Sequence, residues 1–385
     1  MRVIRMKSII PITFLCTLPI VSLQAAEWSI SGSLNPFLEY DDNIFMRDTN
    51  KVGDYHSSVT PTLVTSYALD QTNVSLSVGY AIDRYEASKY LDNETPFFRF
   101  NSSHQTERSK WGLGLSYVKS ASRSEAEIDT GDFETDSTST TRSITPSFVY
   151  QLTERDSLSF RGGYSKKEFS TLDFSDTETK YISTGWQHQF TERLNGGLDL
   201  TANNSKSSSL TTVTDNDSYD LSLVSTYNLS EIWALKGKVG FRLVEDKQTN
   251  DTDSGSSLDI NVSYKFDIDS ANLSISRSLF ASDNGGVNER DQINATFSRQ
   301  LSETLIARVS STYQEIRSAS GGNSNDIRKN FSVSPSIAWN FSSNVNLSLS
   351  YKYRHQKDSQ VGTDVDSNAI MLTLNYDWDG LQISR

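Results

Sequence analysis

The chain contains 385 residues, of which 36% are hydrophobic, and its formal net charge is −12. This acidic balance excludes nucleic acid as a partner, because binding to a phosphate backbone needs a basic surface. After the first two dozen residues, no segment offers the roughly 20 consecutive apolar residues of a membrane helix. The 17 Tyr and 18 Phe favour strands instead.

The first 25 residues have the organisation of a secretory signal peptide. Three basic residues among the first seven precede an apolar segment at 9–23, and Ala25 offers a small residue for cleavage. The single cysteine, Cys16, falls inside the apolar segment, so the mature chain would have no disulfide bond. We therefore expect a signal peptide at 1–25, followed by one domain at 26–385 in a Gram-negative envelope.

The mature chain is dominated by hairpins in which apolar and small polar residues alternate. The clearest copy spans 144–164, with a polar turn at 153–156. Successive side chains of a strand point to opposite faces, so this hairpin has one apolar and one polar face. Similar strands follow at 28–38, 59–67, 74–82, 111–117, 182–190, 194–200, 219–229, 233–241, 258–266, 273–275, 293–301, 305–313, 331–341, 347–353 and 370–378. Together they predict about 18 strands of roughly ten residues, which is enough to cross a bilayer when tilted.

The connections between these strands are of two kinds. Short turns recur, with Thr-Glu-Arg at 106–108, 153–155 and 191–193. The alternate connections are long and polar, at 41–54, 120–140, 165–179, 203–218, 244–256, 282–291, 315–326 and 356–366. A propeller also repeats at such a spacing, but short periplasmic turns and long extracellular loops are typical of outer-membrane barrels. An even strand number places both termini on the periplasmic side.

Aromatic residues lie at both ends of the predicted strands. One set falls at the long-loop ends: Tyr80, Tyr117, Tyr164, Tyr313 and Tyr353. The other falls near the short turns: Trp111, Tyr150, Phe190, Tyr227, Trp233, Trp339 and Trp378. Two aromatic belts around an aliphatic band are typical of a membrane barrel, although cross-strand packing also uses aromatics. We predict an all-β fold, a closed antiparallel up-and-down β-barrel in the outer membrane, with a water-filled lumen instead of a packed core.

The alternation also assigns charged residues to the lumen. The basic set is Arg161, Lys236, Lys238, Arg242, Arg308, Lys352 and Arg354, and the acidic set is Glu39, Asp83, Asp199, Asp220 and Asp259. Because the basic residues are concentrated in later strands, one interpretation is a path selective for anionic solutes. The alternative is a lumen whose charges neutralise one another. Arg277 falls on the apolar face, which predicts a bulge or a shifted register there.

No pattern of catalytic or ligand-binding residues stands out. The four histidines lack metal-ligand spacing, and no Gly-rich phosphate-binding motif is present. We therefore expect no enzyme, no catalytic or cofactor-binding residue and no metal centre. The acidic segment 125–136 has the composition of a loop that collects divalent cations at the cell surface, but it lacks a calcium-loop pattern, and a solvated loop is the alternative.

One short motif resembles a known group of proteins. Residues 40–45 read Tyr40, Asp41, Asp42, Asn43, Ile44 and Phe45, and they follow the first predicted strand. This segment resembles the opening of the β-barrel porin 2 families of outer-membrane proteins. The resemblance implies insertion by the barrel assembly machinery into a layer containing lipopolysaccharide. Some such proteins accompany exopolysaccharide and capsule systems.

Three functions follow as expectations. The first is a conduit for exported polysaccharide, which would work with periplasmic export components. The second is a general diffusion porin for small solutes. The third is a surface-exposed structural or adhesive barrel that acts through its acidic loops. The first two need only a polar lumen, so the sequence does not separate them.

Overall fold

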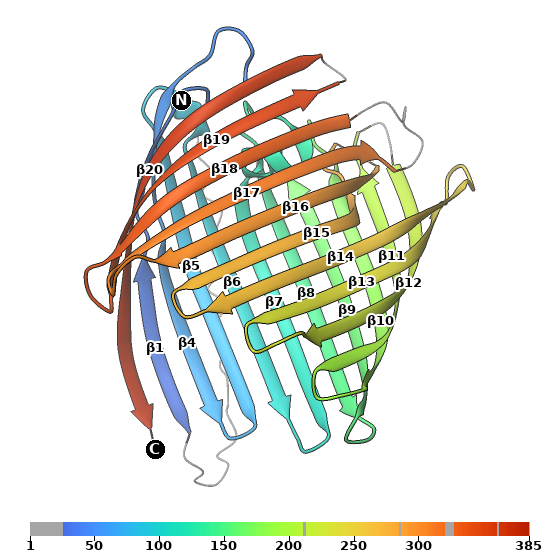
Figure 1. Ribbon diagram of the computed structural model, residues 1–385. Coiled ribbons are helices and arrows are strands. Elements are labelled where there is room, and N and C mark those ends of the chain that lie inside the picture. Colours follow the sequence, from blue (N-terminus) through green and yellow to red (C-terminus); the bar gives the residue numbers. More distant parts are fainter. Residues whose placement is uncertain (1–25, 211–212, 285, 320–326, 360–361, 385) are drawn as a thin grey trace, which may run out of the picture.

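A computed structural model describes residues 26–210, 213–284, 286–319, 327–359 and 362–384, so the predicted signal peptide lies outside the described residues. In this part of the chain nearly all residues are in strands (Figure 1). The strands are β1 (Glu27–Leu34), β2 (Phe37–Asp41), β3 (Asp54–Val59), β4 (Pro61–Leu69), β5 (Thr72–Tyr85), β6 (Asn93–Gln105), β7 (Ser109–Ala121), β8 (Thr138–Gln151), β9 (Asp156–Phe169), β10 (Asp176–Gln189), β11 (Leu194–Ser208), β12 (Val213–Asn228), β13 (Trp233–Asp246), β14 (Thr252–Phe266), β15 (Asp269–Ala281), β16 (Val287–Gln300), β17 (Leu305–Ser318), β18 (Ile327–Asn340), β19 (Val345–Asp358) and β20 (Thr363–Ser384).

Three short helical turns lie between strands: η1 (Lys89–Leu91), η2 (Ser122–Glu125) and η3 (Ala126–Thr130). In the described ranges, no helix has the length and apolar character needed to span a membrane.

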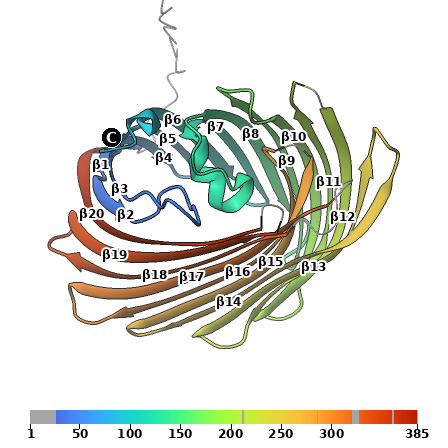
Figure 2. The ribbon, with the colours of Figure 1, turned by 90° about the horizontal axis from the view of Figure 1, so that it is seen from above.

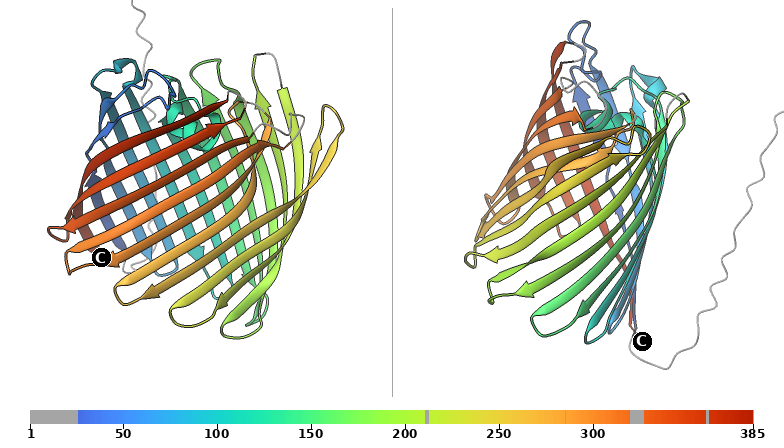
Figure 3. Two further views of the ribbon diagram at one scale, coloured as in Figure 1. Left: turned by 45° about the horizontal axis from the view of Figure 1, so that its top comes forward. Right: turned by 90° about the vertical axis from the view of Figure 1, so that its right-hand side faces the viewer.

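The twenty strand segments build a closed barrel of 18 antiparallel strands. β1 and β2 are two halves of the first strand, because both pair with β20, and β3 and β4 are likewise halves of the second. Each later strand pairs with its neighbours in the chain, and β1 closes the ring against β20 (Figures 1 and 3). Glu27 pairs with Ser384, so both ends of the barrel domain lie at the end of the short turns, as predicted.

The alternation of side chains separates the two faces of the wall. Ile182 is 65% exposed while its neighbour Ser183 is 6% exposed, and Leu223 is 66% exposed beside a fully buried Ser222. A soluble protein would bury the apolar residues. Here the outer face of the wall is apolar and the inner face is small and polar, which is the arrangement expected of a barrel in lipid.

Proline marks the breaks in the first two strands. Pro36 falls between β1 and β2, and Pro61 follows the break between β3 and β4. Proline lacks the N–H that a central strand must donate, so it is found where a sheet is interrupted. The closing seam has its own irregularity, where the register between β1 and β20 shifts near Ile30. Gly380 has a positive φ of 70° there, and a Cβ atom would lie 1.5 Å from the Ile30 carbonyl oxygen.

The strands are longer than the roughly ten residues that we expected. Most contain 13 to 16 residues, so several predicted loops are largely strand. The predicted loop at 165–179, for example, is reduced to 170–175 between β9 and β10. Beyond the apolar band both faces of a strand are polar, so the alternation disappears from the sequence while the backbone ladder continues.

Candidate functional site: a lumen narrowed by two inner loops

Two connections at the long-loop end fold into the barrel and lie inside the ring of strands (Figure 2). We call residues 42–53 the N-terminal inner loop and residues 122–137, which contain η2 and η3, the helical inner loop. The sequence predicted that the acidic segment 125–136 lies at the cell surface. This expectation is wrong, because its backbone and side chains bond to the inner wall of the barrel.

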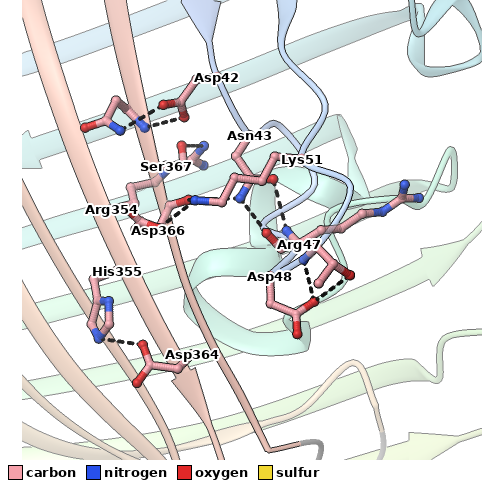
Figure 4. A network of polar contacts seen from close by, with 12 residues as sticks. Asp42, Asn43, Arg47, Asp48, Lys51, Arg354, His355, Asp364, Asp366 and Ser367 are labelled. Atoms are coloured by element: carbon pink, nitrogen blue, oxygen red, sulfur yellow. Dashed lines mark hydrogen bonds and ion pairs between the residues drawn. The ribbon is translucent and has the colours of Figure 1, made fainter.

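The N-terminal inner loop is fastened by Asn43, which is completely buried. Its Nδ2 donates to the carbonyl oxygens of Arg47 at 2.8 Å and Asp366 at 2.9 Å. Its Oδ1 accepts the backbone N–H of Arg47 at 3.0 Å. One amide side chain therefore closes the loop on itself and joins it to β20 (Figure 4).

The two aspartates of the motif hold the loop from the side of the wall. Asp41 is 4% exposed, forms an ion pair with Arg354 of β19, and accepts the hydroxyl of Ser367 at 2.7 Å. Asp42 accepts the side-chain and backbone N–H groups of Asn368, both at 2.8 Å. Tyr40, in contrast, lies on the outer face and is 42% exposed.

The lumen contains apolar packing, whereas we expected a lumen free of any core. Ile44 and Phe45 pack with Tyr85 and Leu91 in one cluster. A second cluster joins both inner loops to β20 and consists of Met46, Ala126, Phe133 and Val365. Apolar side chains inside a wide barrel avoid water only by packing on one another. The loops therefore form a partial plug with a small core of its own.

The helical inner loop reaches across the lumen to the opposite wall. It leaves from β7 and β8, and its contacts are on β17, β18 and β19. The carbonyl oxygen of Glu127 accepts the side-chain N–H groups of Gln314 and Asn330, the latter at 2.6 Å. The Glu127 carboxylate forms an ion pair with Lys352 at 2.8 Å. Gln314 is 1% exposed and Asn330 is 5% exposed, so the two hydrogen bonds to the Glu127 carbonyl oxygen are shielded from water.

Ser282 and Asp283, which follow β15, also contact the helical inner loop. The carboxylate of Asp129 accepts the Ser282 hydroxyl and the Asp283 backbone N–H, both at 2.7 Å. Asp283 forms an ion pair with Lys167 of β9 at 2.5 Å. Burial raises the pKa of the Asp283 carboxyl to about 6, even though Lys167 lies beside it.

Ionic contacts also join the two inner loops to each other. Arg47 and Glu134 form a two-pronged pair, with both nitrogen–oxygen distances at 2.6 Å. The hydrogen bond from Arg47 lowers the pKa of Glu134. Arg123 donates to the carbonyl oxygen of Ile44 at 2.8 Å. The loops are thus held as one unit, although both charges of the Arg47 pair remain partly exposed.

The helical inner loop leaves a cavity of about 760 Å³ between itself and the inner wall. Asp129 lies on the loop side of the cavity, and β10 to β15 form the other side. Charged side chains of both signs line the cavity. Between them lie hydroxyl and amide groups, such as those of Thr201 and Asn203. This space is the part of the lumen where a solute would touch protein on two sides.

Most of the sequence-assigned lumen charges are paired. Asp199 is 6% exposed and lies 3.2 Å from Arg161 and 3.4 Å from Lys238, which also lies 3.4 Å from Asp220. The other pairs are Arg242 with Glu289, Lys352 with Glu127, Arg354 with Asp41, and His56 with Asp83. Within the described ranges, Lys236, Arg308, Glu39 and Asp259 have no ion pair. Because most of these charges face a partner of opposite sign, the arrangement favours a lumen whose charges neutralise one another over a path lined by a positive wall.

Arg277 needs no bulge, contrary to the sequence-based prediction. The register of β15 with β14 and β16 is continuous through this residue. Its guanidinium instead meets Asp291 of β16 at 2.6 Å, and Asp291 also pairs with Arg317. The pairing of β14 with β15 stops at Arg277, so the ends of β15 and β16 separate from β14 there.

The described residues contain no group of three or more His, Cys, Asp or Glu side chains suited to a metal ion. The inner loops were missed by the sequence analysis, yet a signal was present. Ile44, Phe45 and Met46 are three apolar residues in succession within a polar loop, and Ala126, Ile128 and Phe133 interrupt the acidic one.

Similar architectures occur among solved outer-membrane proteins. OccAB4 of Acinetobacter baumannii is 12% identical, with a TM-score of 0.52, over 94% of this chain and 99% of that one. The outer membrane protein OpdK of Pseudomonas aeruginosa is 10% identical, with a TM-score of 0.50, over 91% and 99%. OccAB2 of Acinetobacter baumannii matches at the same identity and score, over 91% and 98%.

These identities show a shared fold, which is that of an 18-stranded outer-membrane porin barrel. No model of a protein family matches this chain. No curated protein matches it either. The resemblance of residues 40–45 to the β-barrel porin 2 families therefore stays an expectation.

Proposed function

We propose that the protein is a channel of the outer membrane for small polar solutes, and that the helical inner loop sets the width of its path. The observation that carries the proposal is the bonding of Glu127 to Gln314, Asn330 and Lys352 on the opposite wall. A loop anchored at both sides of a barrel restricts the lumen without closing it. The fold shared with outer-membrane porins supports the same function.

The lining of the remaining cavity favours small solutes that carry charge or many hydroxyl groups. Lys238 and Asp220 face the cavity together with Thr201, and both carboxylate and ammonium groups are therefore within reach of a solute. Sets of charged side chains of opposite sign tune passage without binding a solute tightly. A solved structure of OpdK holds vanillate, so vanillate is a suitable probe beside neutral sugars.

A conduit for polysaccharide is the second candidate, and only the motif at 40–45 favours it. A polymer chain would require the helical inner loop to leave the lumen, which means breaking its bonds to β17, β18 and β19. An adhesive barrel acting through the segment 125–136 loses its basis, because that segment faces the lumen.

The test is conductance in planar lipid bilayers. A variant in which a short Gly-Ser linker replaces residues 124–135 should conduct several times more current than the wild type and admit larger sugars in liposome swelling. The control replaces the turn at 247–251, which lies outside the lumen, with a linker of the same kind. Unchanged current in the first variant would refute the narrowing role, and absence of current in every protein would refute the channel.

Polysaccharide export has a separate readout. If export is the function, deletion of the gene removes polymer from the cell surface and leaves it in the periplasm. Unchanged surface polymer, together with conductance in bilayers, would leave small-solute passage as the function.

A further inference from the structure

The outer face of β7 to β11 carries a row of charged residues at its long-loop end. Paired positions on neighbouring strands share a face, and the register joins Tyr117 to Arg142, Arg142 to Lys166, Lys166 to Glu178 and Glu178 to Lys206. Tyr117 is 36% exposed and Ile144, two residues from Arg142, is 40% exposed. The row therefore points away from the lumen.

This sector of the rim is basic although the chain as a whole is acidic. Its outward charged residues at and beyond the tyrosines are Lys119, Arg142, Lys166, Lys180 and Lys206 against Glu168, Asp176 and Glu178, which is five positive charges less three negative ones, or two positive. The next sector, on β12 to β14, has the opposite balance, with Asp215, Asp217 and Glu245 against Lys247. The basic balance of this sector therefore ends between β11 and β12.

The basic row lies directly beyond an aromatic belt. Arg142 is placed over the ring of Tyr117 and Lys180 over the ring of Tyr164, both at 5.8 Å from the ring centre. On β7, the outward residues Trp111, Leu113 and Leu115 precede Tyr117. Tyrosine belts mark the level of lipid headgroups, so the row stands where headgroups begin.

Basic side chains of the row form ion pairs with glutamates of the same row, but these pairs do not occupy all of their N–H donors. Glu168 accepts from both Arg142 and Lys166, the latter at 2.7 Å, and Glu178 pairs with Lys180 at 2.6 Å. The side chains of Arg142 and Lys180 remain 53% and 58% exposed. No ion pair of Lys119 or Lys206 occurs among the described residues. The remaining N–H groups are free to meet an anion with several oxygens.

We propose that this outer face of β7 to β11 is a binding site for the headgroup of a phosphorylated glycolipid of the outer leaflet. The phosphates meet Arg142, Lys166 and Lys180, and the acyl chains lie along the apolar band below Tyr117 and Tyr164. The proposal rests on insertion of the barrel in the membrane and is independent of what passes through the lumen.

The test uses the full barrel in detergent, with bound lipid counted by native mass spectrometry. The probes are bisphosphorylated lipid A and the same lipid with its phosphates removed. The variant carries Arg142→Gln, Lys166→Gln and Lys180→Gln. The control carries Arg84→Gln, Lys329→Gln and Lys357→Gln, which change the net charge equally on other strands. Heat-modifiable gel mobility shows that both variants are folded.

We expect the first variant to bind lipid A roughly a hundredfold more weakly than the wild type, and the control to bind as the wild type does. Three results would each overturn the proposal: equal loss in both variants, equal binding of the phosphate-free lipid, or displacement of lipid A by millimolar inorganic phosphate, which would indicate a site for free anions.

Discussion

Replacement of Asn43 by alanine tests whether one buried amide holds the N-terminal inner loop in the lumen. The substitution removes three hydrogen bonds, of 2.8, 2.9 and 3.0 Å, and leaves the Asp366 carbonyl oxygen and both backbone groups of Arg47 without those partners. Each such loss costs about 1 kcal/mol. The loop should therefore dock less firmly by about 3 kcal/mol, which is roughly a hundredfold in the docking equilibrium.

Hydrogen exchange of the Asp42 amide measures this equilibrium, because its bond to the Asn368 carbonyl oxygen at 3.0 Å joins the loop to β20 and is not removed by the substitution. Open-channel current noise in planar bilayers reports the same motion. Thr49→Ala is the matched control, because Thr49 is an exposed residue of the same loop and its side chain, within the part of the chain that the structure describes, bonds only to Asp48. Asn43→Asp should weaken the docking of the loop more than Asn43→Ala does, since it places a second carboxylate beside Asp41.

Two results would refute this reasoning. The first is an exchange rate of the Asp42 amide in Asn43→Ala equal to that in Thr49→Ala. The second is an Asn43→Asp protein that behaves as the wild type. Either would mean that the apolar clusters of the loop suffice to hold it.

Three further predictions concern the lumen. Asp199→Asn should raise the permeability ratio of chloride to potassium about tenfold, because an anion roughly 6 Å away loses about 0.7 kcal/mol of repulsion in water and a cation there loses the same amount of attraction; a reversal potential that does not move would contradict this. Since the pKa of Asp283 rises from 3.8 to about 6 on docking, docking of Ser282 and Asp283 on Asp129 should be strongest below pH 4, weaken as the pH rises to 6 and stay constant above it. Exchange of the Asp283 amide, corrected for its intrinsic rate, checks the trend, which Asp283→Asn should abolish. Gly131→Ala should loosen the helical inner loop and raise conductance, since a Cβ there would lie 2.5 Å from the Arg328 guanidinium carbon and would push this group away from the Asp129 carbonyl oxygen that it bonds. Gly286→Ala, at a similarly positive φ and with nothing within 4 Å of the added Cβ, should leave conductance unchanged.

The barrel itself is predictable from the sequence because its signal is periodic. Alternation in segments such as 144–164 identifies the strands, and the same alternation places Asp199 and Lys238 on the inner face. The alternation does not identify β6, because Phe97 and Phe98 are adjacent there and the segment has no clear period of two. Phe97 turns inward over Gly79, where a Cβ atom would lie 2.2 Å from its ring.

The inner loops are not predictable in the same way. Loop residues have no period, and their position depends on partners far along the chain, such as Asp366 for Asn43 and Asn330 for Glu127. The sequence assigns a face to each strand residue but not its partner on another strand. For the same reason it assigns Arg277 to the apolar face without revealing that Asp291 stands beside it.

The pairing of β1 with β20 has a consequence for biogenesis. The two strands that seal the cylinder are the earliest and the latest in the barrel domain, so the seal forms only after β20 has been synthesised and exported. A prematurely terminated product would carry two open edges whose peptide groups find no water in hydrocarbon. Such a fragment has no stable place in the bilayer, and the cell is expected to degrade it.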